Sequence, residues 1–429
     1  MNAAERKAAL IQVQNTEPAM TGIPIKYHGE RRTFNAYEIP LDYLVYNKLN
    51  GRIGSVVKTY ERQYRPLDVE NPDDVKKIED FLMESKKDAN IKTRKSLLED
   101  HQQKYGIVTA AGVIIDGNRR ACLLNSLRHD DSIQPNLKQH CERFLAVILP
   151  VDADDKEILR LETTFQMGED AKVDYNPIEK YLKCQDLKDK EFTDREIASF
   201  MGESESNIRM YQEVLKLMDE YLEYYHYDGM YTLLKTNEDS FQKLNIALKA
   251  YKAGNVAMWE YDPEFDTEDL KLITFDYIRF GFDQEDVRDI FTRPSAANPN
   301  RSFFGCKDIW ESFRDTHFNT IEPITNNEKS VDQIIQNSNG GDVTRLLIAR
   351  DNEWKKSAGP LLKENYGISK EKLSNKQASD NPLKLLQKAL EAIQSVDTTQ
   401  DSFKEDNRVK DCVLEISRTM WEYKKLLEK

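Results

Sequence analysis

The distribution of strand-forming residues along the chain is the feature that most restricts its fold. Short β-branched runs occur at 106–110 (GIVTA), 111–116 (AGVIID) and 143–151 (RFLAVILPV), and a helical stretch, ACLLNSLRHD, separates the last two. A further strand is expected in YEIPLDYLVY (37–46), and apolar residues at helical spacing predict a helix in PDDVKKIEDFLMES. After Thr164 strand patterns nearly vanish. We therefore predict an α+β chain, with a compact N-terminal α/β domain followed by a largely all-α region.

The length of 429 residues predicts two or three domains. The pattern divides the chain into an N-terminal extension (1–34), the α/β domain (35–170), a helical domain (171–320), a linker rich in Asn, Ser and Gly (321–345) and a C-terminal helical region (346–429). No apolar run is long enough to span a bilayer, and the N-terminus lacks the apolar core of a secretory signal. We expect a cytoplasmic protein with no membrane partner. Its five cysteines form no C-x-x-C pair, so the sequence indicates neither a zinc site nor a disulfide framework.

A helix-turn-helix is predicted at about 192–218, within FTDREIASFMGESESNIRMYQEVLKLM. Thr193 and Glu196 have the spacing of a capping box, Gly202 permits the turn, and Ser204 or Ser206 starts the second helix. The candidate DNA-contacting residues are Ser204, Ser206, Asn207 and Arg209.

The charge around this element argues in two directions. Residues 191–225 carry nine acidic against three basic side chains, which repel a polyanion, and the net charge of the chain is −13. By contrast, 26–65 carries eight basic against four acidic side chains and could contribute to DNA binding. The alternative is that the helix pair is a structural or protein-binding element.

The C-terminal region carries apolar residues at helical spacing, which predicts a helical hairpin. They are Leu383, Leu386, Leu390 and Ile393, followed by Val409, Val413, Ile416, Met420 and Leu427. Such a seam can pair two helices across a homodimer or within one chain, and both alternatives stay open.

The stretch VIIDGNRRACLL (113–124) places two arginines where a helix begins. A helix N-terminus already carries partial positive charge, so Arg119 and Arg120 are unfavourable there unless an anion compensates. A turn glycine, helix N–H groups and arginine together suit a phosphate. The alternative is that both arginines pair with surface carboxylates.

Four segments, in order, resemble motifs of the ParB family, whose N-terminal domain is shared with sulfiredoxin. The first is Asn47-Lys48-Leu49-Asn50-Gly51-Arg52, which follows Ile39-Pro40-Leu41-Asp42 and is similar to N-P-x-Q-P-R; the second is Gly117-Asn118-Arg119-Arg120, similar to G-E-R-R. The third has two parts: Glu162-Thr163-Thr164-Phe165-Gln166, similar to E-N-x-Q-R, and Asn176-Pro177-Ile178-Glu179, similar to N-P-I-E. The fourth is the helix-turn-helix. The resemblance covers about residues 35–220, half of the chain.

The resemblance implies a ParB/sulfiredoxin-like nucleotide-binding domain that acts as a nucleotide-dependent switch on DNA. The nucleotide would be CTP or ATP with Mg, and slow hydrolysis (CTPase or ATPase) is a possible activity. Carried over by position, Gly117, Asn118, Arg119, Arg120, Arg52 and Thr163 bind the nucleotide; Glu162, Gln166 and Asn50 are catalytic; and Glu162 also holds the metal. The physics agrees, because a polyphosphate needs cationic groups and magnesium prefers carboxylate oxygens.

The sequence departs from the family pattern at several positions, which leaves hydrolysis open. Asn118 stands for the acid of G-E-R-R, Thr163 for the Asn of E-N-x-Q-R, Met167 for its Arg, and Lys48 and Gly51 for two prolines. For Glu162 the ordinary alternative is a solvated helix glutamate. Two other functions stay open: a nuclease or phosphotransferase on the same fold, and an interaction protein with a degenerate pocket. The long helical half fits a mobile-element or phage-defence member better than a chromosome-partition factor.

Overall fold

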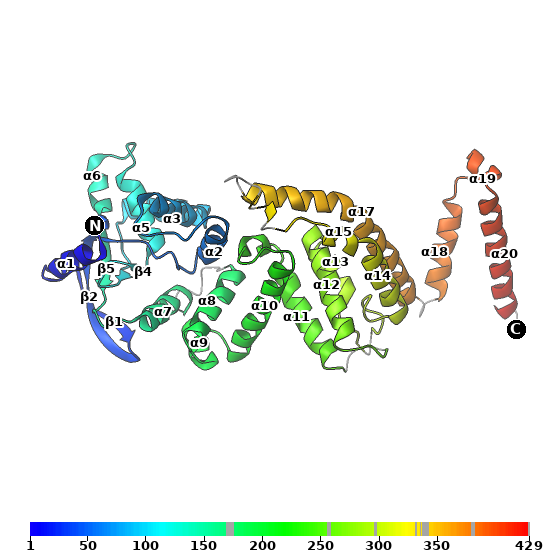
Figure 1. Cartoon of the computed structure of the whole chain (residues 1–429), viewed down its shortest axis with the longest axis horizontal. Helices are drawn as coiled ribbons and strands as arrows, with labels where there is room; N and C mark the ends of the chain where they lie inside the picture. The colour runs from blue at the N-terminus through cyan, green and yellow to red at the C-terminus, as the bar shows by residue number, and fades with distance from the viewer. Residues whose placement is uncertain are drawn as a thin grey trace.

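The computed structural model describes residues 1–168, 176–254, 259–295, 298–330, 333, 334, 336, 343–378 and 382–427. A sheet-containing domain lies at one end, a helical body in the middle and the C-terminal helices at the other end (Figure 1). Within the described ranges no helix is both long and apolar enough to cross a membrane. The chain is thus mixed α+β and mostly helical, as the sequence predicted.

One five-stranded sheet, in the order β1-β2-β5-β3-β4, organises the N-terminal domain. Its pairs are antiparallel except β3 with β5, which run parallel. The strands are β1 (Met20–Tyr27), β2 (Glu30–Pro40), β3 (Gly106–Val108), β4 (Ile114–Asp116) and β5 (Arg143–Ile148). The four strand regions expected from apolar runs are confirmed.

Strand β1 was not predicted, and it changes the description of residues 1–34. This segment, expected as an extension ahead of the domain, supplies helix α1 (Ala3–Gln14) and β1, which pairs with β2 from Met20 opposite Ala36 to Tyr27 opposite Glu30. Pro24 argues against a strand in the sequence because proline has no N–H to donate to a neighbouring strand. An edge strand such as β1 tolerates a proline.

Alternate residues of the central strands face two separate apolar cores. Phe144 and Ala146 of β5 belong to the core under α3, α4 and α5, whereas Val147 belongs to the core that includes Leu161 of α7. The helices around the sheet are α2 (Gly54–Gln63), α3 (Pro72–Glu84), α4 (Lys87–Glu99), α5 (Asn118–Arg128), α6 (Pro135–Lys138) and α7 (Asp155–Thr163). Each fully buried large apolar side chain contributes about 1.5–3 kcal/mol, so the sheet is anchored on both faces.

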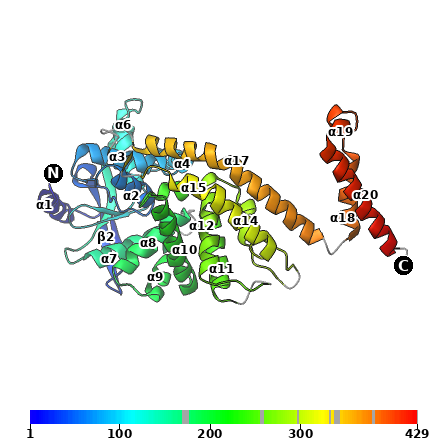
Figure 2. The ribbon, with the colours of Figure 1, turned by 45° about the vertical axis from the view of Figure 1, so that its right-hand side comes forward.

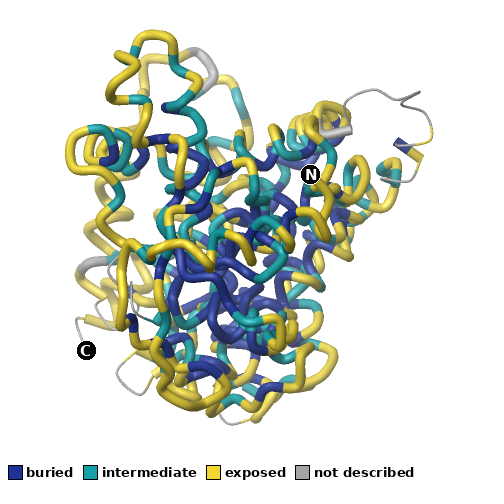
Figure 3. Tube along the Cα trace, turned by 90° about the vertical axis from the view of Figure 1, so that its left-hand side faces the viewer, coloured by how far each residue is buried: buried dark blue, intermediate teal, exposed yellow. Residues whose placement is uncertain are grey.

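The middle of the chain is a helical body with one continuous apolar core, running from Met167 to Leu373. In the view along the long axis, buried residues gather in the interior and exposed residues on the outside (Figure 3). The helices are α8 (Pro177–Asp189), α9 (Asp194–Met201), α10 (Glu205–Tyr224), α11 (Glu238–Lys252), α12 (Phe265–Phe280), α13 (Gln284–Phe291), α14 (Lys307–Thr320), α15 (Glu322–Asn326) and α17 (Val343–Ala378).

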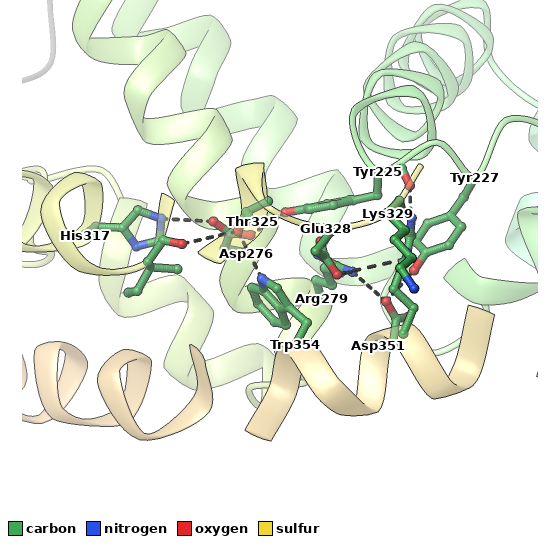
Figure 4. Close-up of polar contacts among 12 residues, drawn as sticks. Tyr225, Tyr227, Asp276, Arg279, His317, Thr325, Glu328, Lys329, Asp351 and Trp354 are labelled. Atoms are coloured by element: carbon green, nitrogen blue, oxygen red, sulfur yellow. Dashed lines mark hydrogen bonds and ion pairs between the residues drawn. The ribbon is translucent and has the colours of Figure 1, made fainter. Parts of the chain in front are cut away.

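A buried charge cluster around Arg279 ties α12 to α17 (Figure 4). Arg279 donates to Glu328 at 2.6 Å and to Asp351 at 2.6 Å, and its guanidinium lies 4.5 Å from the ring centre of Tyr225 and 4.4 Å from that of Trp354. Glu328 falls within the expected linker 321–345, whose first part therefore packs on the body; residues 331, 332, 335 and 337–342 lie outside the described residues.

The C-terminal helices are α18 (Pro382–Gln394), α19 (Asp401–Glu405) and α20 (Asn407–Leu427). They stand apart from the helical body in both views (Figures 1 and 2). None of the residues from 382 to 427 whose exposure is described is buried. In the apolar seams expected at Leu383 to Ile393 and at Val409 to Leu427, Val409 is half-buried and the other predicted residues are exposed.

Candidate functional site

The turn between β4 and α5 is built as the sequence predicted. Gly117 has φ +98°, in the left-handed region, and a Cβ there would meet Cζ of Phe144 at 2.6 Å. Only glycine fits both restrictions. The helix begins directly after it, at Asn118.

Asn118 joins two of the resembling segments. It is 1% exposed, its Oδ1 accepts from the main-chain N–H of Asn47 at 2.9 Å, and its Nδ2 donates to the carbonyl of Ile114 at 2.9 Å. Both ends of the amide are thus engaged within the protein. Asn118 positions the loop 47–52 against the sheet instead of presenting its side chain at a surface.

The two arginines have different surroundings. Arg120 pairs with Asp116 at 2.9 Å and donates to the carbonyls of Tyr105, at 3.2 Å, and Lys104. For Arg120 the structure therefore shows the alternative raised above, pairing with a carboxylate of the protein. Arg119 is half-buried at the start of the same helix.

Gln166 brings a third segment to this place. It lies in a π-helical turn, Thr164–Gly168, that continues α7. Its Nε2 donates to the carbonyl of Ile115 at 3.0 Å, and its Oε1 lies 3.2 Å from where a Cβ on Gly51 would be. That Oε1 is buried and accepts no hydrogen bond within the described part of the chain.

Glu162 is buried and paired with a lysine that sequence reasoning missed. Both Glu162 and Lys183 have side chains that are 2% exposed, and Nζ of Lys183 lies 3.2 Å from Oε2 of Glu162. Burial raises the pKa of Glu162, while the Lys183 ammonium opposes the shift. The alternative of a solvated glutamate is wrong. The one sequence signal for Lys183 is its i,i+4 spacing from Glu179 on a helix of buried residues.

Glu179, in the second part of the third segment, connects α8 to helix α2. Its carboxylate accepts from the N–H of Ser55 at 3.1 Å and from the Ser55 hydroxyl. Helix α2 has no side-chain cap of its own at Ile53, so Glu179 satisfies its first turn from α8. Burial raises the pKa of Glu179, against the hydrogen bonds from Ser55, which lower it.

A cavity of about 230 Å³ lies beside Glu179, between the 52–56 segment, α3–α4 and the start of α8. The predicted site residues Gly117, Asn118, Arg119, Arg120, Glu162 and Gln166 are not among the residues that line it. Three basic and two acidic side chains line it. The lining residues are Arg52, Val56, Phe81, Glu84, Ser85, Lys86, Asn176, Glu179 and Lys235. Of the remaining predicted site residues, Asn50 accepts from the Arg52 N–H at 3.0 Å, and the Thr163 hydroxyl donates to the Leu159 carbonyl. Both are buried and face inward.

The predicted DNA-contacting residues cluster at the start of α10. The capping box between Thr193 and Glu196 on α9 is confirmed, and Gly202, at φ +67°, ends that helix. Ser204 caps α10 by accepting from the Asn207 N–H at 3.1 Å, and Arg209 lies 4.0 Å from Glu205. Ser206 is exposed. Contact of this surface with DNA stays a prediction.

Comparison with known proteins gives little to add to this geometry. No protein-family model matches the chain, and no curated protein matches it. Among solved structures, the C-terminally truncated chromosome-partitioning protein ParB from Caulobacter crescentus, complexed with CTP-gamma-S, is similar at 16% identity and a TM-score of 0.18. That match covers 49% of this chain and 92% of the other. A TM-score at this level supports no conclusion about fold or function.

Proposed function

We propose that this chain binds a nucleoside triphosphate, CTP or ATP, at the cavity beside Arg52 and works as a ParB-like, DNA-associated switch. One observation carries the proposal: the segments that resemble ParB motifs, far apart in sequence, meet at one place. Asn118 contacts Asn47, Gln166 contacts Ile115 and approaches Gly51, and Glu179 contacts Ser55. Such convergence is what a built ligand site requires.

The chemistry of the cavity favours a polyphosphate. Arg52, Lys86 and Lys235 supply positive charge from three different elements, and arginine offers paired donors that match phosphate oxygens. Fixed cations from separate elements also allow the ligand to draw those elements together. Ligand binding would then change how the sheet domain sits against α8 and the helices after it.

The groups expected to be catalytic all contact other groups of the protein. Glu162 is paired with Lys183, Gln166 is bonded to the main chain at Ile115, and Asn50 is bonded at Arg52. A general base must reach the attacking water. We therefore propose nucleotide binding with, at most, slow hydrolysis.

Magnesium, implied by the resemblance, does not fit the residues as they lie. A magnesium ligand must approach to about 2.1 Å, and the Glu162 carboxylate already faces the Lys183 ammonium at 3.2 Å. A second cation on that carboxylate would be repelled. Within the described ranges, no three His, Cys, Asp or Glu side chains lie together so as to hold a metal.

The other two parts of the proposal concern DNA and self-association. The α9–α10 pair would contact DNA through Ser204, Ser206, Asn207 and Arg209, helped by the basic segment 26–65. The exposed apolar residues of α18 and α20 would pair two copies of the chain, since an isolated seam of this kind is costly in water.

Calorimetric titration with CTP, ATP, GTP and ADP tests the nucleotide claim. We expect saturable heat for at least one triphosphate and a loss of about tenfold or more in affinity for Arg52→Ala, from loss of one charge-assisted contact. Arg31→Ala, at an exposed position on β2, is the matched control and keeps wild-type affinity. Heat from none of the nucleotides would contradict the proposal.

That negative outcome would favour the interaction protein with a degenerate pocket. The observation that favours this alternative is that Asn118 and Arg120 bond to other groups of the protein. In that case both Arg119→Ala and Arg52→Ala would leave partner binding unchanged.

A further inference from the structure

The buried pair Lys183–Glu162 lies against the 49–51 part of the loop that also carries Arg52. Lys183 comes from α8, Glu162 from α7, and the Lys183 ammonium also lies 3.4 Å from the carbonyl of Leu49, in the loop that resembles the first family motif. Its Cε would be 3.4 Å from a Cβ on Gly51. One lysine thus touches two of the converging segments.

An ionised carboxylate at this depth requires a cation. Burying an ionised group without a partner is strongly unfavourable, and a polyphosphate brought next to Glu162 would add repulsion. A protein can supply the compensating charge with a metal ion or with a side chain. Here a side chain is already in place, with the same 2% exposure as the carboxylate that it neutralises.

The other charged groups near Glu162 do not replace Lys183 as its partner. Asp186, one turn along α8, raises the pKa of Glu162, and its own carboxylate pairs with Lys58 at 3.3 Å on the α2 side. Glu179 is bonded to Ser55. Lys183 is therefore the basic group that faces Glu162 among the described contacts.

We propose that Lys183 is the built-in cation of this site, so that the nucleotide binds without a divalent metal. The inference rests on the proposed nucleotide binding and states that this binding needs no metal ion. Lys183 takes the role that a magnesium ion would have in neutralising Glu162, and the phosphates are left to Arg52, Lys86 and Lys235. Lys183 acts as a positioning residue, through Glu162 and the 47–52 loop.

The first test titrates the wild-type protein with the nucleotide that binds, once in Mg²⁺ and once in EDTA. We expect dissociation constants that agree within about threefold, because no metal bridges Glu162 and the ligand. A loss of binding in EDTA overturns the inference and leaves the proposed function intact.

The second test needs no nucleotide. Lys183→Met leaves Glu162 without its cation, so Mn²⁺ should raise the melting temperature of this variant and leave that of wild type unchanged. The double variant Glu162→Gln/Lys183→Met removes the need for a cation and should lose the response to Mn²⁺. Lys183→Arg, which keeps the charge, should behave as wild type.

Lys180→Met is the matched control on the same helix, because Lys180 pairs with Glu203 away from the site. If Lys183→Met does not fold alone, refolding with and without Mn²⁺ decides the point: recovery only with the metal supports the inference, and no effect of the metal contradicts it. If no nucleotide binds in either buffer, the proposed function fails, and the Mn²⁺ response alone then decides the role of Lys183.

Discussion

The Arg279 cluster and the Lys183–Glu162 pair are both buried charges, but they are held in different ways. Arg279 of α12 meets two carboxylates and two aromatic faces, contributed by the C-cap of α10, by α17 and by the segment after α15. Lys183 meets one carboxylate and one carbonyl, and beside it Oε1 of Glu162 and Oε1 of Gln166 accept no hydrogen bond among the described residues. The first arrangement holds helices together through many partners, whereas the second leaves two buried acceptors without a hydrogen bond in the part of the chain that the structure describes.

The largest effect on stability is expected for Arg279→Met. Removing the guanidinium breaks its ion pairs with Glu328 and Asp351, whose side chains are 15% and 25% exposed, while Arg350 still lies 4.0 Å from Glu328 and the Tyr227 hydroxyl still donates to Asp351. The loss should therefore be roughly 3 kcal/mol, the low end for breaking a buried ion pair. Urea unfolding followed by circular dichroism measures the loss. Arg301→Ala, at an exposed position, is the control and should unfold as wild type does. Equal stability of the two variants would show that the cluster is not a structural anchor.

A smaller loss is expected for Asn118→Ala. The N–H of Asn47 and the carbonyl of Ile114 lose their partner, at about 1–3 kcal/mol for buried groups left unsatisfied. Because the 47–52 loop carries Arg52, nucleotide affinity should fall as well. Unfolding midpoints and titrations of the same preparation check both. Unchanged nucleotide affinity in a destabilised variant would show that the 47–52 loop does not contribute to nucleotide binding.

Glu179→Gln should change how the free energy of unfolding depends on pH. The pKa of Glu179 is raised in the folded protein, so the folded state binds the proton more tightly, and this group's contribution to stability falls as pH rises above its ordinary value of 4.5. Glu179→Gln lacks that dependence. The stability deficit of the variant relative to wild type should therefore shrink between about pH 4.5 and pH 7. Paired urea titrations at several pH values measure it, and a deficit that grows with pH would reverse the assigned sign.

The smallest effect on stability is expected from removing the C-terminal helices. A chain ending at Ala378 loses α18–α20, for which no buried residue is described, so its melting temperature should hardly change. Its mass in solution should fall from dimer to monomer, by light scattering after size-exclusion chromatography. A full-length chain that is already monomeric would rule out the pairing of two copies through these helices.

The parts of the fold that sequence reasoning found are those set by local pattern. The β-branched run before Ile148 gave β5, and the spacing of Thr193 and Glu196 gave a helix start that the structure confirms. Strand β1 was missed because Pro24 is compatible with a strand only at a sheet edge, and an edge is a property of the whole sheet.

The candidate site was predictable in its segments but not in its side-chain directions. The resemblance to the family motifs put forward Asn50, Gln166 and Glu162 as site residues, whereas their inward orientation depends on tertiary packing. The Asp116–Arg120 pair has i,i+4 spacing and could have been expected. Lys183 could not, because lysine is rarely buried and only the position of Glu162 explains its depth.

Hydrogen exchange with and without saturating CTP or ATP tests the central claim most directly, that the converging segments form one nucleotide site. If these segments form one site, bound nucleotide should slow exchange in 47–55, 162–166 and 176–183 and leave α18 and α20 unchanged in the same sample. No change for any nucleotide, or protection confined to the helical body around Arg279, would contradict it.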